Sequence, residues 1–497
     1  MKNIRKELTI IILLTATFGV SAFAQHINTM YWMRPLPQTL HLNPAKQPEC
    51  KGFFALSALG GIYAEAYSQG PNLGKIFKKH PTKVDSFKFD LESIESSLGK
   101  KNAIGVATHV PLVHLGVDIG NDFYLSFGAG IKAYEHFGYP KDLIEIRHGN
   151  YRSDNSPVAF EFRQELRIFS EIYLGISKRI NPNITIGGRL KYIGGTADLS
   201  TKKMKIDWHT ETHPDSIYNW HFDTDVHARG SMPVPWEMKK DEDGNFTGDL
   251  EIEDLDEMEP SEWAKTLIFG KNPGMGVDLG AEVSLLDNQL LLSASVVDLG
   301  FVRWKSNAKS LINQGIFEFS GLKADTIIDN IFTEKKDAKS EGDQLFEELK
   351  DSIRSQFTPV ERDEAYTTGL PTKMYFGAGY QPLDWLNIGL LYRGAFYNHQ
   401  VFSAYTLSAN LYFLKGCTYT MSYTYGNRSH NLGLGLSLRL GPFQIFAISD
   451  NIALPFWLIN ESDASDRILR KTNMTNVICG LNFMFGCSKK GDQGLFY

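Results

Sequence analysis

The chain has 497 residues and a formal net charge of −6 at neutral pH. This acidic balance gives no electrostatic basis for binding nucleic acid, which excludes a nucleic-acid partner. Aromatic residues make up 12% of the chain beside 44 glycines, a balance that suits a β-barrel with aromatic girdles and a lumen lined by small residues, although a large soluble β-sandwich would share it.

The first 24 residues have the pattern of a secretory signal peptide. Lys2, Arg5 and Lys6 precede an apolar run from Leu8 to Leu14, and Ala22-Phe23-Ala24 forms a small-residue cleavage site. The alternative is a membrane anchor, but the apolar run is too short to span a bilayer comfortably. We therefore predict export and cleavage after Ala24, and localisation in the outer membrane follows from the strand pattern below.

Residues 25–51 are polar and punctuated by proline, so they cannot form one regular strand. They carry Pro35, Pro37, Pro44 and Pro48 together with Trp32. We predict that this N-terminal segment lies either in the periplasm or in the lumen of a barrel.

The remainder of the chain contains segments in which apolar and polar or small residues alternate with period two, as barrel strands that face lipid and lumen require. The clearest are residues 123–133, 184–192, 276–285 and 432–440. Charged residues occupy only the positions assigned to the inner face, which predicts a wet lumen. The predicted lumen-lining charges are Arg189, Lys191, Asp278, Glu282 and Arg439.

Tight turns rich in Pro, Gly, Asn and Asp alternate with long polar connections, which is typical of outer-membrane barrels with short periplasmic turns and long external loops. The fold class predicted is an all-β transmembrane antiparallel barrel of about fourteen strands with a small helical insert. The barrel spans residues 52–487, with long external inserts at 199–272 and 305–369 and a periplasmic tail at 488–497. The predicted strands are 53–68, 103–118, 122–136, 159–180, 184–198, 274–286, 289–304, 371–381, 386–398, 400–414, 417–425, 431–440, 443–450 and 474–486.

One strand breaks its own alternation. Between Val296 and Trp304 the apolar parity changes near Asp298 and Gly300, which predicts a bulge or kink there. These two residues are the candidates for a lateral kink in the barrel wall.

The predicted inserts carry two further candidate features. His221, Asp223, Asp225 and His227 recur at spacing two, so an extended segment would place all four on one face, where they could bind a divalent cation; the alternative is a solvated hairpin face. Residues 343–357 show apolar residues at helical spacing, which predicts a helix that packs as a lid over the barrel mouth or docks to another protein.

The four cysteines differ in their predicted positions. Cys50 begins the first strand and Cys487 follows the last, so a closed barrel would bring them together at the periplasmic end, where a disulfide could lock the seam. The alternative is two unpaired thiols. Cys417 lies near a periplasmic turn and could compete, whereas Cys479 takes a lipid-facing position.

The last strand, residues 474–486, alternates glycine and asparagine with large apolar residues, the pattern that outer-membrane assembly machinery recognises; the alternative is an ordinary amphipathic strand. Motifs for cofactor-binding or catalytic loops are absent from the sequence, which predicts a non-enzymatic protein without a cofactor. A surface lipid hydrolase is the less favoured alternative, and its sparse candidate residues are Asn398, His399, Ser403, Ser429 and His430.

Several short stretches occur in a characteristic order: residues 42–45 with 48–50, 139–143, 298–301 with Trp304, 370–373 and 480–487. In this order and spacing the chain resembles the uncharacterised outer-membrane barrel proteins of Bacteroidota, a domain of unknown function similar to long-chain fatty-acid transporter barrels. The resemblance implies fold and location, but that family has no established activity. In the fatty-acid transporters an N-terminal segment plugs the lumen, which implies the same for residues 25–51. A fainter likeness is to secretion-system accessory barrels.

The leading functional hypothesis is a channel or transporter for a small hydrophobic or amphipathic solute, embedded in the lipid bilayer of the outer membrane. The alternative is an interaction or secretion-accessory barrel that binds protein partners at the cell surface. Permeation predicts a continuous cavity, whereas docking predicts a filled lumen and an exposed apolar lid.

Overall fold

The computed structural model describes residues 27–56, 60–71, 78–79, 87–88, 91–212, 218–240, 246–252, 259–319, 359–397, 400–414, 416–426, 429–451 and 474–487. The predicted signal peptide, the predicted helix at 343–357 and the predicted tail at 488–497 lie outside these residues. None of the described helices is long and apolar enough to span a bilayer.

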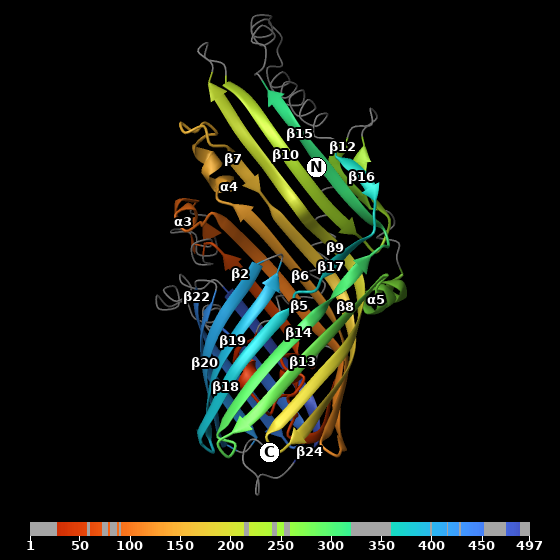
Figure 1. Cartoon of the computed structure of the whole chain (residues 1–497), viewed down its shortest axis with the longest axis vertical. Coiled ribbons are helices and arrows are strands. Elements are labelled where there is room, and N and C mark those ends of the chain that lie inside the picture. Colours follow the sequence, from red (N-terminus) through yellow and green to blue (C-terminus); the bar gives the residue numbers. More distant parts are fainter. Residues whose placement is uncertain are drawn as a thin grey trace, which may run out of the picture.

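The described strands form a closed antiparallel barrel of fourteen strands, which confirms the predicted fold class (Figure 1). β1 and β2 together make the first strand, because both pair with β5 on one side and with β24 on the other. The strands of the ring are β1 (Cys50–Leu56), β2 (Ile62–Gln69), β5 (Lys101–Gly120), β6 (Phe123–Pro140), β8 (Arg163–Asn181), β9 (Ile184–Thr212), β13 (Asn272–Leu285), β14 (Leu290–Trp304), β18 (Lys373–Leu383), β19 (Leu386–Tyr397), β20 (Gln400–Leu414), β21 (Cys417–Gly426), β22 (Ser429–Leu440), β23 (Phe443–Ser449) and β24 (Met474–Cys487).

Alternation along the strands sorts side chains between lipid and lumen. In β22, Leu432, Leu436, Leu438 and Leu440 are exposed on the outer surface, whereas the residues of the other parity are buried or half-buried inside. The short turns gather at one end of the barrel, and several use positive φ angles, as at Asn121 and Gly441. We call this end periplasmic and the opposite end external, following the rule for outer-membrane barrels.

The predicted inserts contain strands that are absent from the strands predicted above. β9 continues past residue 198 to Thr212, because its alternation of polar and apolar side chains continues. Beyond the barrel it pairs with β7 (Val158–Glu161) and β10 (Tyr218–Ser231), and β10 pairs with β15 (Ala308–Phe319). These strands form an external sheet that rises above the ring (Figure 1).

The remaining elements are short. β16 (Val360–Asp363) pairs with β15, and β17 (Tyr366–Gly369) pairs with the external end of β14. Two small hairpins are β3 (Lys78–Lys79) with β4 (Phe87–Lys88), and β11 (Trp236–Lys240) with β12 (Phe246–Ile252). The helices are the 3-10 helices η1 (Thr29–Trp32), η2 (Pro37–His41) and η4 (Ile146–His148) and the α-helices α3 (Leu91–Glu95), α4 (Asp142–Glu145) and α5 (Pro260–Phe269).

Candidate functional site in the lumen

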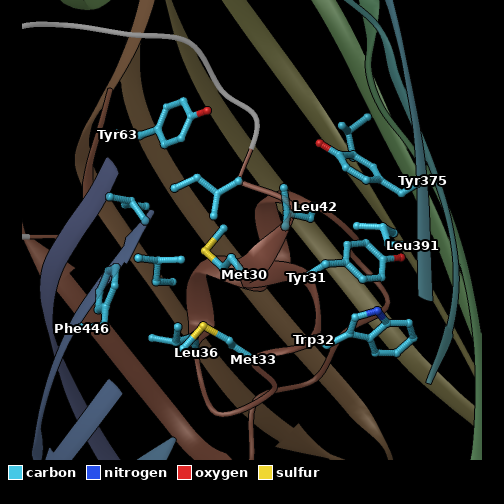
Figure 2. Close-up of a cluster of buried hydrophobic side chains, with 14 of the residues drawn as sticks. Met30, Tyr31, Trp32, Met33, Leu36, Leu42, Tyr63, Tyr375, Leu391 and Phe446 are labelled. Carbon is cyan, nitrogen blue, oxygen red and sulfur yellow. The ribbon is translucent and has the colours of Figure 1, made fainter. Parts of the chain in front are cut away.

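Residues 27–49, which we call the lumenal segment, fill the lower lumen. η1 and η2 are too short to form a hydrophobic core of their own, and their side chains pack instead against the inner wall of the barrel. Met30, Trp32 and Leu36 are buried beside wall residues such as Tyr375 and Phe446 (Figure 2). The structure therefore places this segment inside the barrel.

Glycines on the inner wall make the space for the lumenal segment. A Cβ atom at any of these positions would lie within 2.7 Å of an atom of the segment, closer than real Cβ contacts allow. Trp32 fills the space beside three of them. The seven glycines are Gly187, Gly280, Gly377, Gly379, Gly389, Gly433 and Gly435.

Buried hydrogen bonds fix the start of the lumenal segment. The Asp450 carboxylate accepts the backbone N–H groups of Asn28 and Thr29 at 2.8 Å each, and Asn476 Nδ2 donates to it at 3.2 Å. Arg393 Nη1 donates to Asn28 Oδ1 at 3.3 Å. These contacts tie the beginning of the segment to β19, β24 and the end of β23.

The middle and end of the segment are fixed in the same way. Gln38 Nε2 donates to Asn482 Oδ1 at 2.6 Å on β24. Lys46 Nζ donates to Glu282 Oε1 at 3.0 Å, which places the predicted lumen-lining Glu282 against the segment. The lumenal segment is thus an integral part of the folded barrel.

Above the segment lies a layer of buried ion pairs, which we call the ionic layer. Asp298 contacts three lysines, with distances to Nζ of 3.1 Å for Lys132, 2.6 Å for Lys191 and 2.9 Å for Lys373. Glu171 lies 2.8 Å from Lys132, and Asp278 lies 2.8 Å from Lys191 and 3.6 Å from Arg189. The predicted inner charges Arg189, Lys191 and Asp278 therefore meet in one network.

An apolar cluster lies on the external side of the ionic layer. On β9 the order from the periplasmic end is Gly187 against the lumenal segment, Lys191 in the ionic layer and Ile193 in the apolar cluster. The same order recurs on β14, where Asp298 precedes Val302. The cluster comprises Ala107, Tyr134, Phe169, Ile193, Val302, Trp304, Ala308, Tyr366 and Leu370.

The barrel wall is interrupted beside this cluster. Asp298 has a positive φ of 58°, and the register between β13 and β14 shifts at this point, which is the predicted bulge. β14 pairs with β18 up to Val297 and with β17 from Phe301, so residues 298–300 face the connection 370–372 rather than a strand. We call these two stretches the wall break.

Few bonds close the wall break. Leu370 N–H donates to the Gly300 carbonyl at 2.9 Å, and Thr372 Oγ1 donates to the Asp298 carbonyl at 3.1 Å. Between them, Pro371 has no N–H to donate. The Asp298 backbone N–H is held by Asp278 Oδ1 at 2.7 Å. Because the Asp298 carboxylate belongs to the ionic layer, that layer holds the bulge in place.

Burial perturbs the titration of groups in the lumenal segment. Desolvation, reinforced by nearby His114 and Arg189, lowers the pKa of His41 well below its usual range. Burial likewise raises the pKa of Tyr31 to about 12. The lumen therefore favours neutral side chains where no opposite charge is provided.

The structure pairs Cys50 with Cys487 at the periplasmic end of the seam, where the register places them opposite each other. Arg439 Nη1 lies 3.6 Å from the Cys50 sulfur, half-buried near the periplasmic rim rather than deep in the lumen. Within the described residues Cys417 and Cys479 are unpaired, and Cys479 is exposed on the outer surface. The bridge closes the barrel directly after the lumenal segment.

The four metal candidates lie on β10 in the external sheet. They do not converge on one point, because Asp225 pairs with Lys203 and Gln314, whereas His221 lies between Glu211 and Glu318. Among the residues that the structure describes, no group of three or more His, Cys, Asp or Glu side chains could hold a metal ion.

The hydrolase candidates are not assembled into a described site. Ser403 lies 3.2 Å from Tyr392 Oη, and His430 Nδ1 lies 2.5 Å from Tyr423 Oη. Asn398 and His399 lie outside the described residues, as does the side chain of Ser429.

Sequence reasoning missed Glu171, Lys373 and Asp450. The signal for Glu171 was a charged residue within the mostly apolar and aromatic stretch 168–176. Lys373 and Asp450 stand at strand ends, where charge is common, so nothing local distinguished them.

A model of a family described as "Family of unknown function (DUF5723)" matches residues 44–450. A search of curated protein sequences gives no match. The solved structures to which the chain is similar include the Pseudomonas putida toluene transporter TodX, at 8% identity and a TM-score of 0.37 over 90% of this chain and 94% of that one. A second is the Ralstonia pickettii toluene transporter TbuX, at 9% identity and a TM-score of 0.37 over 90% of this chain and 94% of that one. A third is a Pseudomonas aeruginosa FadL homologue, at 9% identity and a TM-score of 0.39 over 94% of this chain and 100% of that one. At these values we draw no functional conclusion from the likeness.

Proposed function

This chain belongs to the family of unknown function DUF5723, and we propose that it is an outer-membrane transport barrel that passes a small hydrophobic or amphipathic solute sideways through its wall. A solute entering from the external end would reach the apolar cluster and leave through the wall break. The lumenal segment would keep the path to the periplasm closed to water and ions.

The position of the wall break carries this proposal. Leu370 belongs to the apolar cluster and also supplies one of the few bonds that close the break. On the other side, Leu299 and Phe301 are exposed on the outer surface of the barrel. Apolar side chains therefore flank the weakest part of the wall on both of its faces.

The inside of the barrel disfavours a straight path for such a solute. Below the apolar cluster the solute would meet the ionic layer, and moving an apolar molecule there would separate buried ion pairs, which is costly. Below that layer the lumenal segment fills the space between the strands. A sideways path avoids both obstacles.

A disulfide lock tests the proposal. Phe301 and Gly369 are register partners directly above the break, and a Cβ at Gly369 would lie 3.9 Å from the Gly300 carbonyl oxygen, which leaves room for a side chain. The pair Phe301→Cys/Gly369→Cys can therefore be introduced in a background with Cys417 and Cys479 replaced by serine. The control pair is Leu390→Cys/Leu407→Cys, register partners that are likewise exposed to lipid but lie in continuous sheet.

Uptake of toluene or N-phenyl-1-naphthylamine by cells carrying the protein in an intact outer membrane is then measured. We expect oxidation of the first pair to reduce uptake at least tenfold and reduction to restore it, with no effect for the control pair. Uptake that is unchanged by the lock, or no uptake above cells lacking the protein, would reject the proposal.

A second candidate function is a barrel that binds a partner at the cell surface. The external sheet favours it, because β9 runs for 29 residues and, with β10 and β15, extends well past the ring (Figure 1). A lumen filled by its own segment also agrees with this role. An interaction barrel would be insensitive to the lock at the wall break, so the same experiment separates the two functions.

A further inference from the structure

Among the described residues, the external sheet ends in a strand that is only partly paired. β15 pairs with β10 along its whole length, from Ala308 to Phe319. On its other side β15 pairs with β16 only from Lys309 to Ile312. We call residues 313–319 the external edge, and in the described parts of the chain no strand pairs with the outer side of Gln314, Ile316 and Glu318.

The backbone groups that the external edge presents can be assigned. The Ala308 carbonyl accepts the N–H of Glu364 on the β16 side, and the Gly315 carbonyl accepts Thr224 Oγ1 on the β10 side. Because neighbouring residues of an antiparallel strand point their backbone groups to opposite sides, the even-numbered residues face outward. Gln314, Ile316 and Glu318 thus direct three N–H and three C=O groups away from the sheet.

Apart from the charge of Glu318, these residues lack the features that usually protect an edge strand. Natural edges carry lysine, proline or a bulge to prevent pairing with another chain. The external edge has none of these over residues 313–319, and its register with β10 is continuous. Ile316 is 73% exposed, although it lies in the external sheet and away from the lipid-facing surface of the ring.

The surroundings of Ile316 are acidic. Asp223 lies opposite it on β10, and Glu318 lies two residues further along β15. Glu211 and Glu318 flank His221 at 3.5 and 3.2 Å. The lysines on this face are already engaged, since Lys203 pairs with Asp225 and Lys205 with Asp207.

We propose that the external edge binds an extended segment of another protein by β-strand addition, and that the segment presents an apolar side chain flanked by basic ones. Main-chain hydrogen bonds to Gln314, Ile316 and Glu318 supply the pairing. The apolar side chain lies beside Ile316, and the basic side chains lie beside Glu318 and Asp223. This site is independent of the wall break, so it stands or falls separately from the transport proposal.

The probe for this site is the fluorescently labelled peptide Lys-Thr-Val-Thr-Lys-Thr-Lys, which places its lysines and valine on one face of a strand. Binding to the full-length protein in detergent is measured by fluorescence anisotropy. The matched peptide has glutamate in place of each lysine. We expect saturable binding of the lysine peptide that weakens as salt is raised, and at least tenfold weaker binding of the glutamate peptide.

Two variants of the protein test the pairing and the charge separately. Ile316→Pro removes an outward N–H without removing a bond to β10, and we expect it to weaken binding at least tenfold. Glu318→Lys should weaken binding of the lysine peptide and strengthen binding of the glutamate peptide. Asp363→Lys is the charge-matched control, because Asp363 is exposed but lies in β16, where β15 is already paired; it should leave binding unchanged. Heat-modifiable electrophoretic mobility verifies that each barrel is folded.

Three results would overturn the proposal. Binding that is equal for Ile316→Pro and the unchanged protein would show that the edge is not used. Amide hydrogens of Ile316 and Glu318 that are protected from exchange before peptide is added, with no peptide bound, would show that the chain covers its own edge. Self-association abolished by Ile316→Pro would assign the edge to a second copy of the chain.

Discussion

Replacing Trp32 by alanine removes the largest side chain of the lumenal segment. Trp32 is 1% exposed, and its ring fills the space beside Gly377, Gly379 and Gly389. Its backbone carbonyl accepts Tyr412 Oη at 3.2 Å, a bond that the substitution leaves intact. The substitution removes the packing of the ring and its contact with Lys46, whose Nζ lies 5.1 Å from the ring centroid.

Truncation of a buried tryptophan to alanine costs about 3–5 kcal/mol when the site cannot collapse. The wall cannot close around the gap, because its strands are held in the ring by their neighbours. If this energy is lost from docking of the lumenal segment, the undocked population rises about 10²–10⁴-fold, at about 1.4 kcal/mol per tenfold change.

Single-channel recording in planar bilayers measures the consequence. We expect the unchanged protein to conduct rarely and Trp32→Ala to open frequently, with extra cleavage of the lumenal segment by added protease. Trp385→Ala is the control, because Trp385 is half-exposed at a turn of the ring and is not part of the buried cluster around the segment. Conductance and cleavage that are the same in Trp32→Ala and the unchanged protein would refute the view that packing of this side chain keeps the lumen closed.

Three further predictions follow from buried charge, titration and the seam. Asp298→Asn removes the carboxylate charge that Lys132, Lys191 and Lys373 share, and it should destabilise the barrel by about 3–5 kcal/mol. The measurement is the temperature of heat modification in electrophoresis, and an unchanged temperature would contradict the ionic layer's role. His41 has a folded pKa below its ordinary value of 6.5, so the stability it contributes is present above pH 6.5 and is lost as the pH falls further. Protease cleavage of the lumenal segment should therefore rise between pH 7 and 5. His41→Gln should flatten this pH dependence of cleavage. Cys50→Ser removes the bridge to Cys487 and should lower the free energy of unfolding by about 2–4 kcal/mol. Reducing agent should reproduce this loss in the unchanged protein and have no effect on the variant. The same stability of the unchanged protein with and without reductant would mean that the thiols are free.

The fold could be predicted from the sequence because the side chains of a barrel strand face lipid and lumen alternately, which produces a period-two pattern. The leucines of residues 432–440 and the inner charges Arg189 and Lys191 follow this rule, and the structure has all fourteen ring strands near their predicted positions. The parity change near Asp298 corresponds to the observed register shift for the same reason, since a bulge exchanges the two faces.

The site was less accessible because it depends on contacts between distant segments. Lys373 and Asp298 are 75 residues apart, and neither carries a local sign of the pair. The lumenal segment has no period-two pattern, so its sequence is compatible with the periplasm and with the lumen. Its place in the lumen depends on contacts with inner-wall glycines, which are distant in the sequence. β10 falls in a predicted insert because its polar face carries Asp223, Asp225 and Arg229, a charge density that a loop would also have.

Photochemical labelling tests the proposed route most directly. A small hydrophobic probe that carries a diazirine is added to cells, irradiated in the outer membrane and located by mass spectrometry of the protein. The proposed route predicts labels on Val302, Trp304 and Leu370 inside the barrel and on Leu299 at its surface, reduced by the lock at Phe301 and Gly369. Labels confined to the lumenal segment below the ionic layer, or spread evenly over the lipid-facing surface, would contradict it.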